Sequence, residues 1–224
     1  MLVAIAVFPG TNCEMDTKYA FEKLGQKVVL VFHKEEKLPE GTDLVVLPGG
    51  FSYGDYLRSA AIAKFSPIMK AVIKFAQNGG KVLGICNGFQ MLLEARLLPG
   101  AMKRNSSVHF ISKFHPLKVI NNNNAFLSHC NQGEILNIPI AHGEGSYYID
   151  EVGLAQLYQN EQVLLTYSDK QGNLDNPNGS VDSIAAICNK TKNVFGLMPH
   201  PERAIEAILG SDDGIKMLQG LINS

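Results

Sequence analysis

Cys86 has the surroundings of a reactive side chain. It stands between Gly84 and Gly88, directly after the apolar run 81–85 and before a stretch typical of a helix. The spacing G-x-C-x-G is the cysteine form of the nucleophile elbow, a sharp turn from strand to helix that exposes its central residue. Glycines let this turn close, and the positive end of the helix dipole favours the thiolate. Cys86 is therefore the predicted nucleophile.

A thiol nucleophile needs a base and a group that orients this base. Among the six histidines, His200 follows the apolar run 194–198 and lies between two prolines. We expect the run to form a buried strand and the prolines to keep the next residues extended. Because residues two apart in an extended segment point to the same side, His200 and Glu202 should face one site. They are the predicted base and orienting acid.

Acyl transfer also needs N–H donors for a developing oxyanion. In a nucleophile elbow, one donor is the backbone N–H of the residue after the nucleophile, here Asn87. The other should come from a neighbouring strand end, and Leu47-Pro48-Gly49-Gly50-Phe51 fits this requirement because its glycines let a peptide N–H turn inward. We predict Gly50 as the second donor, with Gly49 beside it in the site.

The pattern of elements predicts one α/β domain over residues 1–224. Its first part alternates short apolar runs with helices, which is typical of a doubly wound parallel sheet. After about Lys113 strands follow one another, which indicates an antiparallel extension. The expected strands are 2–8, 28–32, 44–47, 82–85, 117–120, 134–140, 163–167, 184–188 and 194–198. The expected helices are one from an Asp16 cap to about Leu24, one from Ser66-Pro67 to about Ala76, and a last one capped by Ser211.

Composition narrows the class of protein. Hydrophobic residues make up 46% and charged residues 18%, and the net charge of -1 gives no sign of a nucleic-acid partner. No apolar stretch reaches the roughly 18 residues of a membrane span, and the first eight residues are expected to form a strand rather than a signal peptide. The four cysteines show no CxxC pair and the histidines no metal-ligand spacing. We expect a cytoplasmic enzyme without a metal, in which Cys13, Cys130 and Cys188 are structural.

The segments that contain the predicted nucleophile, base, acid and oxyanion donors together resemble the triad-type (class I) glutamine amidotransferases. They are Leu47–Phe51, Gly84–Gln90 and Pro199–Glu202. Further segments resemble the glutaminase subunits of phosphoribosylformylglycinamidine synthases. These are Phe8–Cys13, Gly50–Arg58, Arg104–Ser107, Ile140–Gly145, Asn176–Ser180 and Pro199–Arg203. The likeness extends from about residue 3 to the C-terminus. Ser59-Ala60 and Ser146 depart from the family pattern, in which Cys-Gly and Arg or Asn are expected.

The resemblance implies an activity and a set of site residues. Cys86, His200 and Glu202 would hydrolyse L-glutamine through a thioester, on a class I amidotransferase fold with flavodoxin-like layers. Residues implied to contact the substrate are Gln90, Gly49, His142, Gly143 and Glu144. Residues implied to lie in a partner-binding or mobile loop are Tyr53, Asp55, Arg58 and Arg104.

The resemblance also implies partners. Ammonia would pass to a large synthetase subunit, completed by a small third subunit, which converts formylglycinamide ribonucleotide and ATP to formylglycinamidine ribonucleotide. ATP and Mg²⁺ would bind that partner, and this chain would need no cofactor. Three alternatives stay open at this point: an amidotransferase that serves another synthase, a different cysteine hydrolase, or a non-enzymatic binding module on the same fold.

Overall fold

A computed structural model describes residues 1–223, and its centre is a sheet of nine strands. Five of the strands are parallel and lie in the order β2-β1-β3-β4-β11. They are β1 (Leu2–Val7), β2 (Lys27–Phe32), β3 (Leu44–Leu47), β4 (Lys81–Ile85) and β11 (Val194–Leu197). β3 and β11 are buried along their whole length, as expected for strands covered on both faces. This order is that of flavodoxin-like folds.

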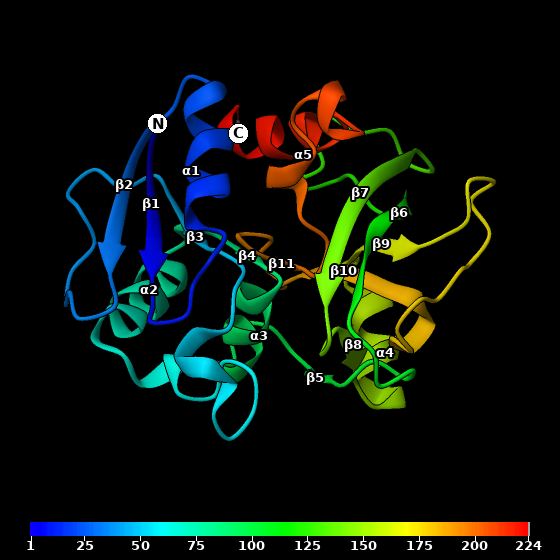
Figure 1. The fold of residues 1–224 in the computed structure, drawn as a ribbon, viewed down its shortest axis with the longest axis horizontal. Helices are drawn as coiled ribbons and strands as arrows, with labels where there is room; N and C mark the ends of the chain where they lie inside the picture. The colour runs from blue at the N-terminus through cyan, green and yellow to red at the C-terminus, as the bar shows by residue number, and fades with distance from the viewer. Residues whose placement is uncertain (224) are drawn as a thin grey trace.

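Helices cover both faces of the parallel strands. They are α1 (Glu14–Lys23), α2 (Pro67–Gln77) and α3 (Asn87–Glu94). The strand order runs one way from β1 to β2 and the other way from β3 to β4, so right-handed crossovers put α1 and α2 on opposite faces. Figure 1 shows α1 above the central strands and α2 and α3 below them. α3 packs against β3, β4 and β11, which holds the first turn of this helix close to the middle of the sheet.

Four antiparallel strands continue the sheet beyond β11, in the order β10-β9-β6-β7. They are β6 (Ile111–Val119), β7 (Ile135–His142), β9 (Val163–Tyr167) and β10 (Ile184–Cys188). A small second sheet pairs β5 (Ala101–Lys103) with β8 (Ser146–Tyr148), and two more helices are α4 (Glu151–Gln159) and α5 (Gly214–Ile222). The predicted fold class, a largely parallel doubly wound sheet with an antiparallel extension, is confirmed.

Several predicted details are wrong. α1 begins at Glu14 with Cys13 at its N-cap, so Asp16 lies inside the first turn instead of capping the helix. α5 has Asp213 at its N-cap, and the hydroxyl of Ser211 accepts a hydrogen bond from the Asp213 N–H just outside the helix. The prediction also missed α4 and the short strands β5 and β8. By contrast, Ser66 and Pro67 begin α2 as predicted. Within residues 1–223, no helix combines the length and apolar character needed to cross a bilayer.

The loops after four parallel strands meet at one edge of the sheet. β1, β3, β4 and β11 are parallel neighbours, so their carboxyl ends lie together. The strand order reverses between β1 and β3, and open α/β sheets bind ligands at such a switch point. Residues 8–13, 48–51, 86–88 and 198–202 follow these four ends. The topology therefore brings together segments that are far apart in the sequence.

Candidate active site

Cys86 lies at a strained turn between β4 and α3. Its backbone adopts φ 51° and ψ -105°, a conformation that residues other than glycine rarely adopt. Its N–H donates to the carbonyl of Leu197 (2.8 Å), which joins the turn to β11. A Cβ added at Gly84 would lie 2.6 Å from the carbonyl oxygen of Gly88, and one at Gly88 would overlap the carbonyl of Leu47. Both glycines are thus required by close backbone approaches at the elbow.

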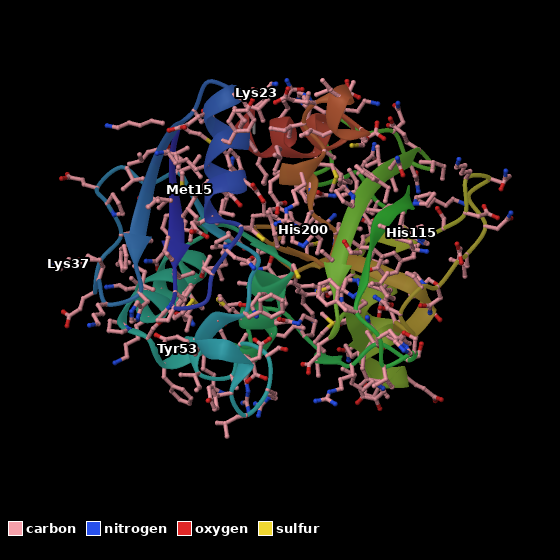
Figure 2. The ribbon with its side chains drawn as sticks, viewed as in Figure 1. Met15, Lys23, Lys37, Tyr53, His115 and His200 are labelled. Atoms are coloured by element: carbon pink, nitrogen blue, oxygen red, sulfur yellow. The ribbon has the colours of Figure 1, made fainter. Side chains whose placement is uncertain are left out.

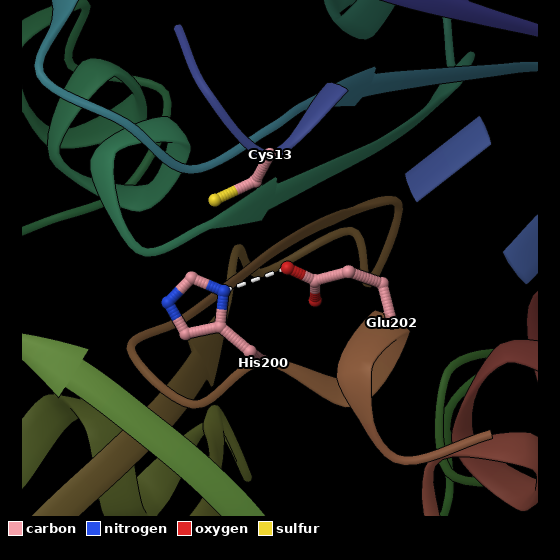
Figure 3. A group of neighbouring side chains, drawn as sticks. All are labelled: Cys13, His200 and Glu202. Atoms are coloured by element: carbon pink, nitrogen blue, oxygen red, sulfur yellow. Dashed lines mark hydrogen bonds and ion pairs between the residues drawn. The ribbon is translucent and has the colours of Figure 1, made fainter. Parts of the chain in front are cut away.

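His200 and Glu202 form a buried pair beside Cys86. The Nδ1 atom of His200 lies 2.6 Å from Oε1 of Glu202, and the two residues are 1% and 2% exposed. Figure 2 shows His200 near the middle of the molecule, and Figure 3 shows its ring facing the carboxylate. Pro201–Arg203 forms a 3-10 turn, so the expected extended conformation is wrong although the two side chains do meet.

The charge state of this pair follows from its surroundings. Burial acts to lower the pKa of His200, but the Glu202 carboxylate and the neighbouring sulfurs of Cys13 and Cys86 hold it well above the ordinary value. Because Nδ1 is bound to Glu202, the remaining nitrogen that can meet Cys86 is Nε2. Among residues 1–223, Nε2 of His200 and Oε2 of Glu202 have no hydrogen-bond partner. The ring therefore has a nitrogen available for a proton transfer.

The two predicted oxyanion donors lie in suitable places. The carbonyl of Gly49 accepts hydrogen bonds from the N–H groups of Asn12 (3.3 Å) and Cys13 (3.2 Å). In a trans peptide the Gly50 N–H points the opposite way, and no group among the described residues accepts a hydrogen bond from it. Asn87 is the first residue of α3, so its N–H has no partner within the helix. Both N–H groups are free to bind an anion at the pocket.

The side-chain amides of Asn87 and Gln90 connect α3 to two loops. The side-chain oxygen Oδ1 of Asn87 accepts a hydrogen bond from the Ser52 N–H (3.0 Å), and its Nδ2 donates to Oε1 of Gln90 (2.7 Å). Gln90 in turn donates to the backbone carbonyl of Glu144 (2.7 Å). The side chain of Glu144 accepts a hydrogen bond from the hydroxyl of Ser59 (2.5 Å). Predicted residues from three separate segments thus form one network along a wall of the site.

Two asparagines hold the loop from His142 to Gly145. The Asn105 amide donates to the carbonyl of His142 (2.8 Å), and its Oδ1 accepts from the Gly145 N–H (3.0 Å). Asn178 donates to the carbonyl of Gly145 (2.8 Å). The imidazole of His142 packs between these asparagines, and burial lowers its pKa to about 4. The sequence showed both asparagines within family motifs but gave them no role.

A pocket of about 290 Å³ lies over Cys86. Its walls contain most of the predicted residues: Cys86, His200, Gly50, Gln90, His142, Gly143, Glu144 and Asp55. They also contain residues that the sequence reasoning did not select: Asn12, Cys13, Phe51, Ser59, Phe110, Ala141 and Arg203. Gly49 lies behind the wall, where an added Cβ would meet Cys13 and His200. The volume is near the lower end for ligand pockets, which suits a small ligand such as an amino acid.

Three of the four predicted partner residues lie outside the pocket. Tyr53 points away, and its hydroxyl meets Nδ1 of His33 (2.8 Å). Arg58 makes a two-pronged contact with Glu94 (2.6 and 2.7 Å). Arg104 is largely exposed and reaches Glu144 at 3.4 Å. The fourth, Asp55, does line the pocket, and burial together with the Glu144 charge raises its pKa.

The described residues contain one group with the atoms of a metal site. The ligand atoms of Cys13, His200 and Glu202 all lie within 4.8 Å of one another. However, Nδ1 of His200 is already bound to Glu202, and the Arg203 guanidinium contacts the sulfur of Cys13 (3.2 Å). Because this positive charge would repel a cation, the group does not fit a metal.

Comparison with known proteins gives a consistent assignment. The model of the family described as CobB/CobQ-like glutamine amidotransferase domain matches residues 1–213. The phosphoribosylformylglycinamidine synthase subunit PurQ of Sulfurimonas denitrificans is 66% identical over the full length of both chains. The PurQ subunit of Campylobacter jejuni is 58% identical over 99% of this chain and 96% of its own.

Solved structures agree with this assignment. The structure of PurLQS from Thermotoga maritima matches with a TM-score of 0.88 and 43% identity, over 99% of this chain and 97% of that chain. A glutamine amidotransferase from the same organism matches with a TM-score of 0.65 and 17% identity, over 100% of this chain and 96% of that chain, and so shares the fold. The chain therefore belongs to the CobB/CobQ-like glutamine amidotransferases and, among them, to the PurQ subunits of phosphoribosylformylglycinamidine synthase.

Proposed function

We propose that this chain is a glutaminase that supplies ammonia to the synthesis of formylglycinamidine ribonucleotide in purine biosynthesis. The observation that carries the proposal is the meeting of three groups: Cys86 at a strained elbow, His200 whose Nε2 has no hydrogen-bond partner among residues 1–223, and the Glu202 carboxylate on Nδ1. The identity to PurQ subunits over the whole chain supports this choice among the amidotransferases.

In the proposed reaction, the Cys86 thiolate attacks the side-chain amide carbon of L-glutamine. The resulting oxyanion accepts hydrogen bonds from the N–H groups of Gly50 and Asn87. Protonated His200 gives its proton to the departing nitrogen, and ammonia leaves a γ-glutamyl thioester on the sulfur. His200 then takes a proton from water, whose oxygen attacks the thioester and releases glutamate with the free thiol. Acid–base help of this kind typically contributes about 10²–10⁴ in rate.

The pocket walls suit the amino-acid end of glutamine. Asp55 and Glu144 place two carboxylates on the pocket, which complement an α-ammonium group. Gln90 is fixed by Asn87 and by the backbone of Glu144, so its side chain is held ready for a polar contact. We propose that these residues, with His142 and Gly143, orient the substrate over the sulfur.

The synthetase half of the reaction belongs to partner chains in this proposal. The sequence contains no G-x-x-x-x-G-K-[ST] phosphate loop, so we assign no cofactor to this chain, and we assign ATP and Mg²⁺ to a large synthetase subunit. A small third subunit completes the assembly, in line with the PurLQS composition of the Thermotoga maritima relative. We place the assembly in the cytoplasm, without nucleic-acid or membrane partners.

The pocket mouth is the proposed docking surface for the large subunit. Phe51 and Phe110 line the pocket and are also exposed, at 47% and 55%. Tyr56 and Leu57 directly follow the pocket residue Asp55 in the chain and are exposed at 74% and 89%. We name these four residues the mouth patch. We propose that ammonia leaves through the same region, so that a partner that covers it would keep ammonia out of bulk water.

A labelling experiment with a matched variant tests the proposal. Cys86→Ala in the reconstituted complex should abolish glutamine-dependent synthesis and leave synthesis from added ammonium salt intact. A diazo-ketone analogue of glutamine should label Cys86, as found by peptide mass mapping, and glutamine should protect it. Cys130→Ala is the control, because Cys130 is also buried but lies away from the pocket. Labelling at another cysteine, or glutamine use by the Cys86 variant, would refute the proposed chemistry.

A further inference from the structure

Cys13 is a buried thiol that lines the pocket and that the proposed mechanism does not use. It lies at the N-cap of α1, after the loop that follows β1, and is 2% exposed. Figure 3 shows its sulfur directed toward the edge of the His200 ring that carries the two nitrogens. A Cβ added at Gly49 would lie 2.9 Å from both the sulfur of Cys13 and Cε1 of His200. The sulfur and the ring therefore flank the same small space.

Two contacts hold the sulfur of Cys13, and a third holds its backbone. Nη2 of Arg203 donates to it at 3.2 Å, and the thiol donates to Oδ1 of Asn12 at 3.1 Å. Arg203 is itself fixed by a hydrogen bond to Asp16 (2.8 Å). The backbone N–H of Cys13 is bound to the carbonyl of Gly49. These contacts come from the loop after β1, the loop after β3 and the turn after His200, so the sulfur cannot move independently of the site.

Within residues 1–223, by contrast, the His200 ring makes one hydrogen bond. That bond goes to Oε1 of Glu202, whose other oxygen has no partner among residues 1–223. One bond to a carboxylate leaves the ring free to tilt, and packing must therefore set the direction of Nε2. Cys13 and Gly49 lie beside the edge of the ring that carries its two nitrogens, so they can supply this packing.

We propose that Cys13 is a positioning residue for His200. The Cys13 sulfur packs against the edge of the imidazole and keeps Nε2 turned toward Cys86. The inference rests on the proposed glutaminase function. A second nucleophile at Cys13 is excluded by its setting, since its backbone is not in an elbow and its sulfur is already engaged by Arg203 and Asn12. Displacing a catalytic group by about 1 Å can cost on the order of 100-fold in rate.

The test compares Cys13→Ala and Cys13→Ser in the reconstituted complex. We expect Cys13→Ala to lower kcat for glutamine hydrolysis by about 10-fold to 100-fold with little change in KM for glutamine. Serine is smaller than cysteine but can still accept a hydrogen bond from Arg203, so Cys13→Ser should recover part of the rate. Cys188→Ala is the control, because it removes another buried thiol far from the pocket and should keep wild-type kinetics.

The pH profile separates positioning from a general loss of structure. The Cys13 contact helps to raise the pKa of His200, so its removal should move the high-pH limb of kcat/KM to lower pH. A merely structural role would lower the amount of folded protein without moving that limb. Wild-type kcat in both variants, or a loss of rate with an unmoved limb and a raised KM, would overturn the proposal. Glutamine hydrolysis by the Cys86→Ala variant would instead refute the glutaminase mechanism itself.

Discussion

Glu202 is a buried carboxylate that has one strong partner. Its Oε1 binds the imidazole of His200, and its Oε2 has no partner within residues 1–223. An isolated buried charge is costly, and a charged imidazole at 2.6 Å offsets this cost. The same interaction keeps the pKa of His200 high. The pair is therefore one electrostatic unit, and the negative charge matters as much as the hydrogen bond.

Glu202→Gln tests this charge with almost no change in shape. The neutral amide still fills the site but no longer favours an imidazolium, and it can present an N–H to Nδ1 and select the wrong tautomer. We expect kcat for glutamine hydrolysis to fall by about 10²–10⁴. Steady-state kinetics at saturating glutamine measures the effect. Glu206→Gln is the control, because Glu206 binds Tyr19 and Lys23 at the surface. Equal rates for the two variants would contradict the assignment.

At the residue scale, local sequence patterns selected Cys86 and His200, the proposed nucleophile and base, but not the residues that surround them. Cys86 was predicted from the spacing of two glycines, and His200 from its place after an apolar run. Cys13 was missed because it approaches His200 through the loops after β1 and β3, which meet only in the folded sheet. A signal did exist, since Cys13 follows the first strand at the same edge as the other strand ends. The catalytic roles of the predicted residues stay predictions.

The segment between β3 and α2 is a strained and firmly attached loop. Tyr53, Asp55, Leu57 and Ala60 all have positive φ, between 54° and 71°. Such conformations cost of order 1–3 kcal/mol each and persist only where the surroundings enforce them. Contacts that attach the loop include Ser52 to Asn87, Arg58 to Glu94 and Ser59 to Glu144. Its tip, with Leu57 89% exposed, is therefore a preformed part of the mouth patch.

Leu57→Glu tests the mouth patch as a docking surface. A charge at this position should oppose burial against the large synthetase chain and weaken the complex by at least 10-fold, because apolar contacts drive such interfaces. Glutamine hydrolysis by the isolated chain should change little. Surface plasmon resonance with the large subunit measures the affinity. Val152→Glu introduces the same charge on α4, where Val152 is also exposed. Unchanged affinity for the Leu57 variant would place docking elsewhere.

At the element scale, helices and strands with a strong sequence pattern were predicted, and those with a weak pattern were not. β1 and β3 are continuous apolar runs, and α2 begins with Ser66-Pro67, so each has a local signal. α4 contains one fully buried residue, Leu157, and therefore shows no apolar stripe. β5 and β8 have three residues each and exist through their mutual pairing. The turn at Pro201–Arg203 forms where α1 and α5 pack against it, a tertiary contact that local sequence does not contain.

At the scale of the whole molecule, the buried histidines His142 and His200 differ in charge. His142 is kept neutral, since burial lowers its pKa to about 4, whereas His200 is kept protonated by Glu202, which holds its pKa high. Between pH 6.5 and 4 the unfolded chain binds a proton at residue 142 that the folded chain excludes, so folding stability falls as the pH falls. His200 contributes nothing in this window, because it is protonated in both states; its stabilisation is lost instead at higher pH, where the folded imidazolium deprotonates.

His142→Gln should therefore reduce the acid sensitivity of the fold. The full shift in the pKa of His142 corresponds to about 3 kcal/mol of stability lost between pH 7 and pH 4. Urea denaturation at pH 7 and at pH 4.5 measures the loss. The variant should be less stable at pH 7, because its contacts with Asn105 and Asn178 are altered, but its stability should fall less on acidification. The control His129→Gln, at an exposed position, should lose as much as the wild type. Equal losses in all three would refute this role of His142.

The position of β11 has a consequence for the order in which activity arises. β11 is the last strand in the sequence, yet it inserts between β4 and β10 in the middle of the sheet, and His200 follows it directly. A growing chain on the ribosome therefore carries Cys86, the proposed nucleophile, for more than a hundred residues of synthesis before His200, its proposed base, is added. Consumption of glutamine by this proposed site, and any release of free ammonia, is thus restricted to chains that have been translated beyond Glu202.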